Sequence, residues 1–283
     1  MIPISDCHTH TNPVNGLGMK SVAKRFREVG GWFIAIVSLP PSHYGYPPTV
    51  EGYQKSFEIV IREADIAREY GLKVSKFVGM HPADVEKNLS RLGPEKTLDL
   101  VEQVFKIIEK MLREGVVDGL GEFGRPHYKA LPEAFAINEY VTIRALELSR
   151  DLGVPIHLHL EQKGLITIIS INKVCKALNA PQKNVIIHHA DSRTAVEASK
   201  VGFPFTLLAK FELVSRVLSN ENATQFALLE SDHIDDPRRP GVALYPWEIR
   251  DCVNALIRNG VHDEVLYKVL IDNVVKTFGV NPP

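Results

Sequence analysis

The chain has 283 residues, of which 45% are hydrophobic and 24% are charged, a composition typical of a soluble globular protein with a large core. Lys and Arg total 33 against 34 Asp and Glu, which excludes a net positive field that would collect nucleic acid. The three cysteines, Cys7, Cys175 and Cys252, lack CxxC spacing, which argues against a disulfide framework or a structural zinc site. No signal-peptide pattern and no apolar run of ~18 residues are present, so we expect a cytoplasmic protein without a membrane span.

Short apolar segments alternate with helical segments along the whole chain. Several of the apolar segments are hydrophobic on both faces, as the strands of a buried parallel sheet are. The predicted strands are, in chain order, Pro3–His8, Trp32–Ser38, Lys73–Gly79, Gly115–Glu122, Val154–His159, Asn184–His189, Pro204–Leu207 and Phe226–Ser231. The predicted helices between them include Glu51–Tyr70, Pro94–Glu114, Pro132–Leu152 and Thr194–Val201.

A strand-helix unit repeated eight times in 283 residues predicts an α/β protein, a closed (β/α)8 TIM barrel that forms one domain over residues 1–283. An open doubly wound sheet is the competing architecture. It would normally place a glycine-rich phosphate loop after the first strand, where this chain has histidines instead. The final helix, His262–Phe278, is expected to cover the flank of the barrel or to close its bottom.

The first candidate site residues lie at the end of the first strand. Active sites of TIM barrels are built from the carboxyl ends of the strands. Side chains alternate along a strand, so Asp6, His8 and His10 share one face, with the two imidazoles about 7 Å apart. Two imidazoles at this spacing can bind one metal ion. The spacing of the two histidines alone is weak evidence for a metal site. Their position at the end of a strand is what makes them candidate ligands.

Further candidates end the fourth and fifth strands. Glu122 ends the fourth strand, and a carboxylate there needs a cation, because an unpaired buried charge is very unfavourable. A structural salt bridge to Arg125 is the alternative explanation. The fifth strand ends in His157 and His159. His159 lies nearer the mouth of the barrel and is the expected ligand, whereas His157 is expected to be a hydrogen-bonded histidine beneath it.

The sixth and eighth strands complete the set. The sixth ends in His188 and His189, and alternation along a strand would allow only one of the two to face inward. Asp232 follows the eighth strand, which neighbours the first strand in a closed barrel. Nitrogen and oxygen ligands without thiolates suit zinc, manganese, magnesium or nickel. The sequence therefore predicts a divalent metal site at the mouth of the barrel.

With these candidate ligands, the chain resembles a divergent member of the TatD-like branch of the amidohydrolase superfamily. The matching segments, in the order of the family, are Asp6-Cys7-His8-Thr9-His10, Val78-Gly79-Met80-His81-Pro82, Gly121-Glu122-Phe123-Gly124, Pro155-Ile156-His157-Leu158-His159 and Leu229-Glu230-Ser231-Asp232. The resemblance implies two divalent ions bridged by Glu122. One would be held by His8, His10 and Asp232, and the other by His159 and a histidine of the sixth strand. His189 compares best with distant relatives there, and His188 is the alternative.

The resemblance also implies a hydrolase in which the two ions activate a shared water and Asp232 accepts its proton. There are departures from the family. Bacterial members follow the fifth-strand histidine with Ser-Arg-Asp, where this chain has Leu160-Glu161-Gln162. Their sixth strand reads His-Cys-Phe-Ser-Gly, whereas here the residues are His188-His189-Ala190-Asp191-Ser192. The hydrolase chemistry therefore transfers to this chain better than the nuclease activity does.

Basic residues after the strands favour a phosphoester substrate, because they can hold phosphate oxygens above the metals. The principal candidates for substrate binding are His81, Arg125 and Arg193. His127, Lys210, Arg238 and Arg239 are further candidates, and we expect at least half of all these groups to be solvated surface charges. The segment Pro40–Thr49 is predicted to be a lid over the barrel mouth. The expected substrate is a small-molecule ester or phosphoester, with single-stranded nucleic acid as a larger alternative.

Three other interpretations fit parts of the pattern. A PHP-type phosphoesterase also opens with Asp-x-His-x-His, but it usually ends with an Asp-x-His pair, whereas Asp232 and His233 are adjacent. A lactonase- or phosphotriesterase-like amidohydrolase would carry a modified lysine where this chain has Glu122. A metal-stabilised binding barrel without catalysis is the alternative outside the enzymes.

Overall fold

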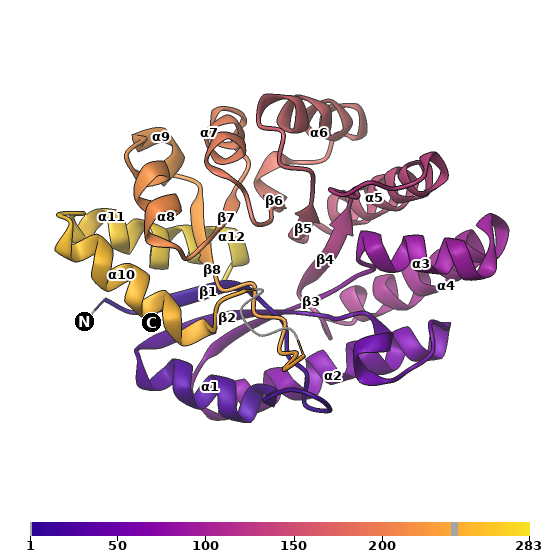
Figure 1. Cartoon of the computed structure of the whole chain (residues 1–283), viewed down its shortest axis with the longest axis horizontal. Coiled ribbons are helices and arrows are strands. Elements are labelled where there is room, and N and C mark those ends of the chain that lie inside the picture. Colours follow the sequence, from indigo (N-terminus) through magenta and orange to yellow (C-terminus); the bar gives the residue numbers. More distant parts are fainter. Residues whose placement is uncertain (1, 239–242) are drawn as a thin grey trace.

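The computed structural model describes residues 2–238 and 243–283 of the chain. Eight parallel strands form one sheet whose spatial order follows the sequence, and Figure 1 shows the helices arranged around the strands in chain order. The strands are β1 (Ile4–Thr9), β2 (Gly31–Val37), β3 (Lys73–Val78), β4 (Gly119–Gly124), β5 (Ile156–His159), β6 (Val185–Ile187), β7 (Phe205–Leu208) and β8 (Ala227–Glu230).

The first and last strands meet, so the sheet curls into a barrel. The backbone N–H of Asp232 donates to the carbonyl of His8 at 3.0 Å, and the N–H of His10 donates to the carbonyl of His233 at 2.7 Å. The predicted (β/α)8 TIM barrel is therefore confirmed. Closure also brings the residues after β8 beside the histidines of β1, as an enclosed parallel barrel requires.

The helices cover the outside of the barrel, and several begin with a recognisable cap. Thr49 accepts a hydrogen bond from Gly52 at the start of α2, and Pro132 occupies the first turn of α5. The helices are α1 (Gly18–Glu28), α2 (Val50–Glu69), α3 (Pro82–Leu92), α4 (Pro94–Arg113), α5 (Pro132–Leu152), α6 (Leu165–Leu178), α7 (Ser192–Val201), α8 (Phe211–Leu218), α9 (Glu221–Thr224), α10 (Ile249–Arg258), α11 (Asp263–Tyr267) and α12 (Asn273–Phe278). Within the two described ranges, no helix is long and apolar enough to cross a membrane.

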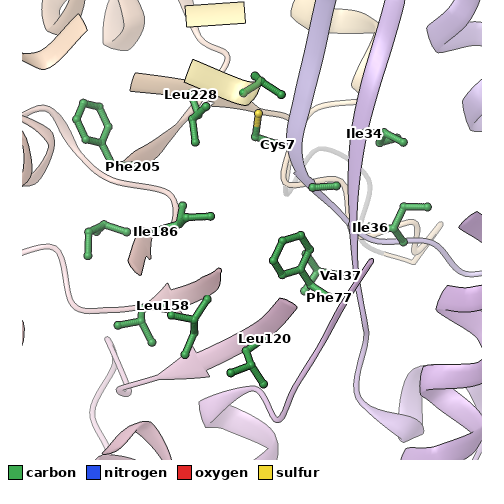
Figure 2. Packing of buried hydrophobic residues seen from close by; sticks show 14 of the residues in the cluster. Cys7, Ile34, Ile36, Val37, Phe77, Leu120, Leu158, Ile186, Phe205 and Leu228 are labelled. Atoms are coloured by element: carbon green, nitrogen blue, oxygen red, sulfur yellow. The ribbon is translucent and has the colours of Figure 1, made fainter. Parts of the chain in front are cut away.

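The core is formed by both faces of the strands, and Figure 2 shows part of it. All seven residues of β2 are buried, as expected for a strand that packs against helices outside and side chains inside. The final helical segment closes the bottom, which is one of the two arrangements expected for it: the ring centroid of Phe278 lies 4.8 Å from that of Phe33 and 5.9 Å from that of Phe77. This segment is not one regular helix, because a π-helical turn over Lys268–Asp272 separates α11 from α12.

The observed strand boundaries differ from the predicted ones by a few residues, and two of these differences concern segments of the site. β4 spans Gly119–Gly124 rather than Gly115–Glu122, because the residues before Gly119 form the turn that ends α4, and Glu122 therefore lies inside the strand rather than at its end. β6 ends at Ile187, two residues before the predicted end, so His188 and His189 lie outside the strand. The alternation rule used for these two histidines therefore does not apply to them.

Candidate metal centre

A cavity of about 630 Å³ opens at the carboxyl ends of the strands. Pro40 and His43, from the segment predicted to be a lid, form part of its wall. Polar residues at the ends of the strands or just after them line its floor, namely His10, Glu122, His159, His188, His189 and Asp232.

Glu122 lies at the centre of this floor and is 5% exposed. Its Oε1 is 3.1 Å from Nε2 of His8 and 3.0 Å from Nε2 of His10. Its Oε2 is 2.9 Å from Nδ1 of His159 and 3.5 Å from Nε2 of His81. Burial alone would raise the pKa of Glu122, but the surrounding histidines outweigh it and hold this pKa well below its usual range. Each oxygen of an ionised carboxylate thus faces its own set of imidazoles.

The first set contains His8, His10 and Asp232, whose ligand atoms lie within 4.8 Å of one another. Nδ1 of His10 donates to the carbonyl of Val37 at 2.9 Å, which leaves Nε2 to face Glu122 as the nitrogen that could bind an ion. Burial lowers the pKa of His8 to about 4. Burial opposes protonation of His10 as well, but the carboxylates of Glu122 and Asp232 outweigh it and raise the pKa of His10. The site therefore attracts a positive charge.

The second set contains Oε2 of Glu122, Nδ1 of His159 and Nε2 of His189. Nε2 of His189 is 3.2 Å from Nδ1 of His159, and that Nδ1 is 2.9 Å from Glu122. Two ligands bound at about 2.1 Å to one tetrahedral ion are separated by roughly 3.4 Å. Nδ1 of His159 is therefore at a suitable distance from each of the other two donors to share one ion with them.

Both histidines that follow β6 face the site, so the expectation that only one could do so is wrong. His189 has a φ of 42°, in the left-handed region, and this backbone turn directs its ring inward beside that of His188. Nε2 of His188 is 3.7 Å from Oδ1 of Asp232 and 4.0 Å from Oε2 of Glu122. Its Nδ1 contacts the buried carboxyl group of Glu230 at 2.8 Å.

Asp232 occupies the rim of the first set, where its Oδ1 is 3.9 Å from Nε2 of His10. It also has a left-handed backbone, with a φ of 49°. Non-glycine residues held in this region concentrate at functional sites. Burial, together with the negative charge of Glu122, raises the pKa of Asp232 to about 7.

His81 faces Glu122 but is set up as a hydrogen-bond donor. Its Nδ1 accepts the backbone N–H of Ala83 at 3.1 Å and so caps α3. Burial lowers the pKa of His81 to about 3, so the imidazole is neutral and its proton lies on Nε2, toward the cavity. A nitrogen that carries a proton has no lone pair for a metal ion.

The two arginines predicted to contact substrate lie elsewhere. The guanidinium of Arg125 binds both carboxylate oxygens of Glu139, at 2.5 and 2.8 Å, and lies 3.6 Å from Glu161. It neither pairs with Glu122 nor lines the cavity. Arg193 lines a separate depression with Lys163 and Arg216. The geometry therefore does not support a substrate contact for either arginine, because two carboxylates hold Arg125 and helix α7 carries Arg193 away from the cavity.

The remaining basic candidates differ in whether they line the cavity. His127 lines the cavity, and Lys210 is not among its lining residues. Arg238 forms an ion pair with Asp236 of its own loop, and Arg239 lies outside the described residues. Sequence reasoning missed Lys87, a lining residue contributed by α3. The signal that could have found it is Pro82, which marks the first turn of this unpredicted helix.

The donor set fits divalent metal ions. Glu122 and Asp232 both lie beside His10, and no Lys or Arg in residues 2–238 or 243–283 forms an ion pair with either of them. Buried carboxylates without a basic partner need another cation. Imidazole nitrogens and carboxylate oxygens supply the ligands that zinc and similar ions bind.

Comparisons with known proteins identify relatives in sequence and in structure. An uncharacterized protein of Methanocaldococcus jannaschii is 27% identical over 287 residues, covering 99% of this chain and 97% of that protein. A TatD-like protein from Archaeoglobus fulgidus has a similar structure, with a TM-score of 0.68, 19% identity and coverage of 98% of this chain and 100% of the other. A mutant lactonase from Deinococcus radiodurans also has a TM-score of 0.68, at 14% identity over 98% and 95% of the two chains.

A third solved structure, a TatD homolog from Escherichia coli K12, has a TM-score of 0.67, with 16% identity and coverage of 98% of both chains. At these identities the structural similarities establish the fold only. The family model described as TatD related DNase matches residues 5–279, which is nearly the whole chain. The chain therefore belongs to the family of TatD-related DNases.

Proposed function

We propose that the protein is a metal-dependent hydrolase that cleaves phosphoesters with a water activated between two divalent ions. The observation that carries the proposal is the position of Glu122, whose Oε1 lies 3.0 to 3.1 Å from His8 and His10 and whose Oε2 lies 2.9 Å from His159. Membership of a DNase family supports the phosphoester class.

His8, His10 and Asp232 would hold one ion, and His159 and His189 the other, with Glu122 bridging the two. Zinc, manganese, magnesium and nickel all suit such ligands. Two bound ions would lower the pKa of a shared water and polarise the phosphoryl oxygen. The His10 ring is fixed for this role by its bond to the carbonyl of Val37, so little reorganisation is needed on binding.

Asp232 is the proposed proton acceptor. In the metal-free protein, burial and the charge of Glu122 raise the pKa of this carboxyl group to about 7. Bound cations would favour its ionised form, and an ionised Asp232 beside the shared water could accept the proton of that water. His81 presents its Nε2–H toward Glu122 from 3.5 Å and would donate a hydrogen bond to a phosphoryl oxygen placed there. Lys87 lines the same cavity and adds a positive charge for the substrate anion.

The cavity suits a small ester or phosphoester, or the end of a single-stranded nucleic acid. Its volume of about 630 Å³ lies within the usual range for small-molecule sites. A balanced net charge of −1 supplies no long-range attraction for a polyanion, so the local groups His81 and Lys87 would provide the recognition.

The test is an assay of the purified protein with manganese, zinc, magnesium or nickel. The substrates are bis-p-nitrophenyl phosphate, p-nitrophenyl phosphate, a lactone and short single-stranded DNA. We expect metal-dependent phosphoester cleavage that Glu122→Gln abolishes and that Glu133→Gln, an exposed change at the start of α5, leaves intact.

Other outcomes contradict the proposal in distinct ways. Lactone cleavage alone would support the lactonase-like alternative. Bound metal without turnover of any substrate would support a binding barrel. Full activity of Glu122→Gln would contradict the bridging role of this carboxylate.

A further inference from the structure

Three histidines of the metal centre present the same ring nitrogen to the site. His8, His10 and His188 direct Nε2 toward Glu122 or Asp232. Their Nδ1 atoms are held from behind, by His157 at 3.0 Å, the carbonyl of Val37 at 2.9 Å and Glu230 at 2.8 Å, respectively. A partner on the second ring nitrogen fixes both the tautomer and the orientation of a ligand histidine.

His159 is reversed. Its Nδ1 lies 2.9 Å from Oε2 of Glu122, and its Nε2 points outward to Nδ1 of His127 at 2.5 Å. His127 belongs to the segment between β4 and α5, and its ring centroid is 4.5 Å from that of His159. The anchors of His8, His10 and His188 are buried, whereas His127 is exposed.

The tautomer of His159 follows from this arrangement. A neutral imidazole carries one N–H and one lone pair, so a His159 that binds an ion through Nδ1 must carry its proton on Nε2. His159 is 7% exposed, so this proton needs a partner within the protein. Nδ1 of His127 is the contacting atom, and it accepts the proton in a hydrogen bond when His127 carries its own proton on Nε2.

We propose that His127 is a positioning residue of the metal centre, which holds His159 in the tautomer that binds the second ion through Nδ1. The inference rests on the proposed two-ion site and extends it to a residue of the surface loop. Ligand atoms of His127, His159 and His189 lie within 4.8 Å of one another. When His159 binds the ion through Nδ1, however, Nδ1 of His127 lies on the opposite side of that ring, so His127 acts through His159 rather than as a ligand.

One consequence is that the ligand histidines of the two proposed ions would be fixed to different degrees. The histidines of the first ion are fixed by buried partners, whereas the tautomer of His159 depends on an exposed residue of a loop. Loss of the acceptor at position 127 should therefore weaken the second ion and leave the first unchanged.

The test compares His127→Leu with His127→Asn, whose side-chain oxygen can take the place of Nδ1. The matched control is His262→Leu, the same substitution at an exposed histidine that precedes α11. Zinc affinities are measured for both ions by competition with a chelator. His127→Leu should weaken one of the two ions about 10- to 100-fold, while His127→Asn and His262→Leu keep both near wild-type affinity.

A spectroscopic readout separates positioning from general damage. NMR of the zinc-loaded protein with ¹⁵N-labelled histidine should show a solvent-protected Nε2–H on His159, which His127→Leu loses and His127→Asn retains. Unchanged affinity for both ions in His127→Leu would overturn the inference, and so would an equal loss in the Leu and Asn variants. A wild-type protein that binds fewer than two zinc ions would instead overturn the two-ion site on which the inference rests.

Discussion

Removal of the charge of Asp232 should stabilise the metal-free protein. The pKa of this carboxyl group rises from 3.8 to about 7, because burial and the neighbouring Glu122 disfavour its ionised form. Between about pH 4 and pH 7 the group is protonated in the folded protein but ionised in the unfolded chain. The wild type therefore loses stability as the pH rises through this window, and the full loss is present above about pH 7.

The magnitude follows from this shift. A change of about three pKa units corresponds to roughly 4 kcal/mol. The side chain of Asp232 keeps 29% of its exposure, so solvent screens part of the effect, and we expect about 2 kcal/mol for Asp232→Asn. In a chain of this size such a gain raises Tm by about 5 °C.

The assay is thermal unfolding of chelator-treated wild type and Asp232→Asn at several pH values, with Asp99→Asn on the exposed face of α4 as the control. Asp232→Asn should be more stable at pH 8, and the difference should vanish near pH 4. Saturating metal should reverse the order, since the wild type binds the ions more tightly. A metal-free Asp232→Asn that is less stable than the wild type at pH 8 would refute the reasoning. The ionised carboxylate of Asp232 would then stabilise the folded protein by pairing with a positively charged group.

Further predictions concern the arginine and the paired histidines. Arg125→Met removes the bidentate pair with Glu139 and should lower the free energy of unfolding by about 2 kcal/mol with KM for bis-p-nitrophenyl phosphate unchanged. A raised KM at wild-type stability would restore the predicted substrate contact. His189→Ala should lose one bound ion by elemental analysis, whereas His188→Ala should retain both, because Nε2 of His189 lies 3.2 Å from Nδ1 of His159. The opposite pattern would assign the ligand to His188.

The barrel could be predicted because its signals are local. Each strand is a short apolar segment, and the order of eight such segments with helices between them allows few other arrangements. The predicted helix over Pro132–Leu152 matches α5 at both ends, where a proline in its first turn and Gly153 at its end mark the boundaries. Gly153 has the left-handed φ of 68° that such an ending requires.

The site was predictable as a set of strand ends but not in its finer geometry. The sequence led to the region around Glu122 because polar residues interrupt buried strands there. The inward turn of both His188 and His189 depends on the left-handed backbone of His189, which has no signal in a single sequence. The capture of Arg125 by Glu139 depends on packing between β4 and α5, two elements whose relative placement the sequence does not specify.

The most direct test of the account is a count of metal ions, with their positions. A crystal structure of the zinc-loaded protein, with anomalous scattering and elemental analysis of the same sample, should show two ions per chain on either side of Glu122. One ion should lie beside His10 and Asp232, and the other beside His159. A single ion, or none, with the Glu122 carboxylate still bound only to histidines, would contradict the proposed two-ion centre.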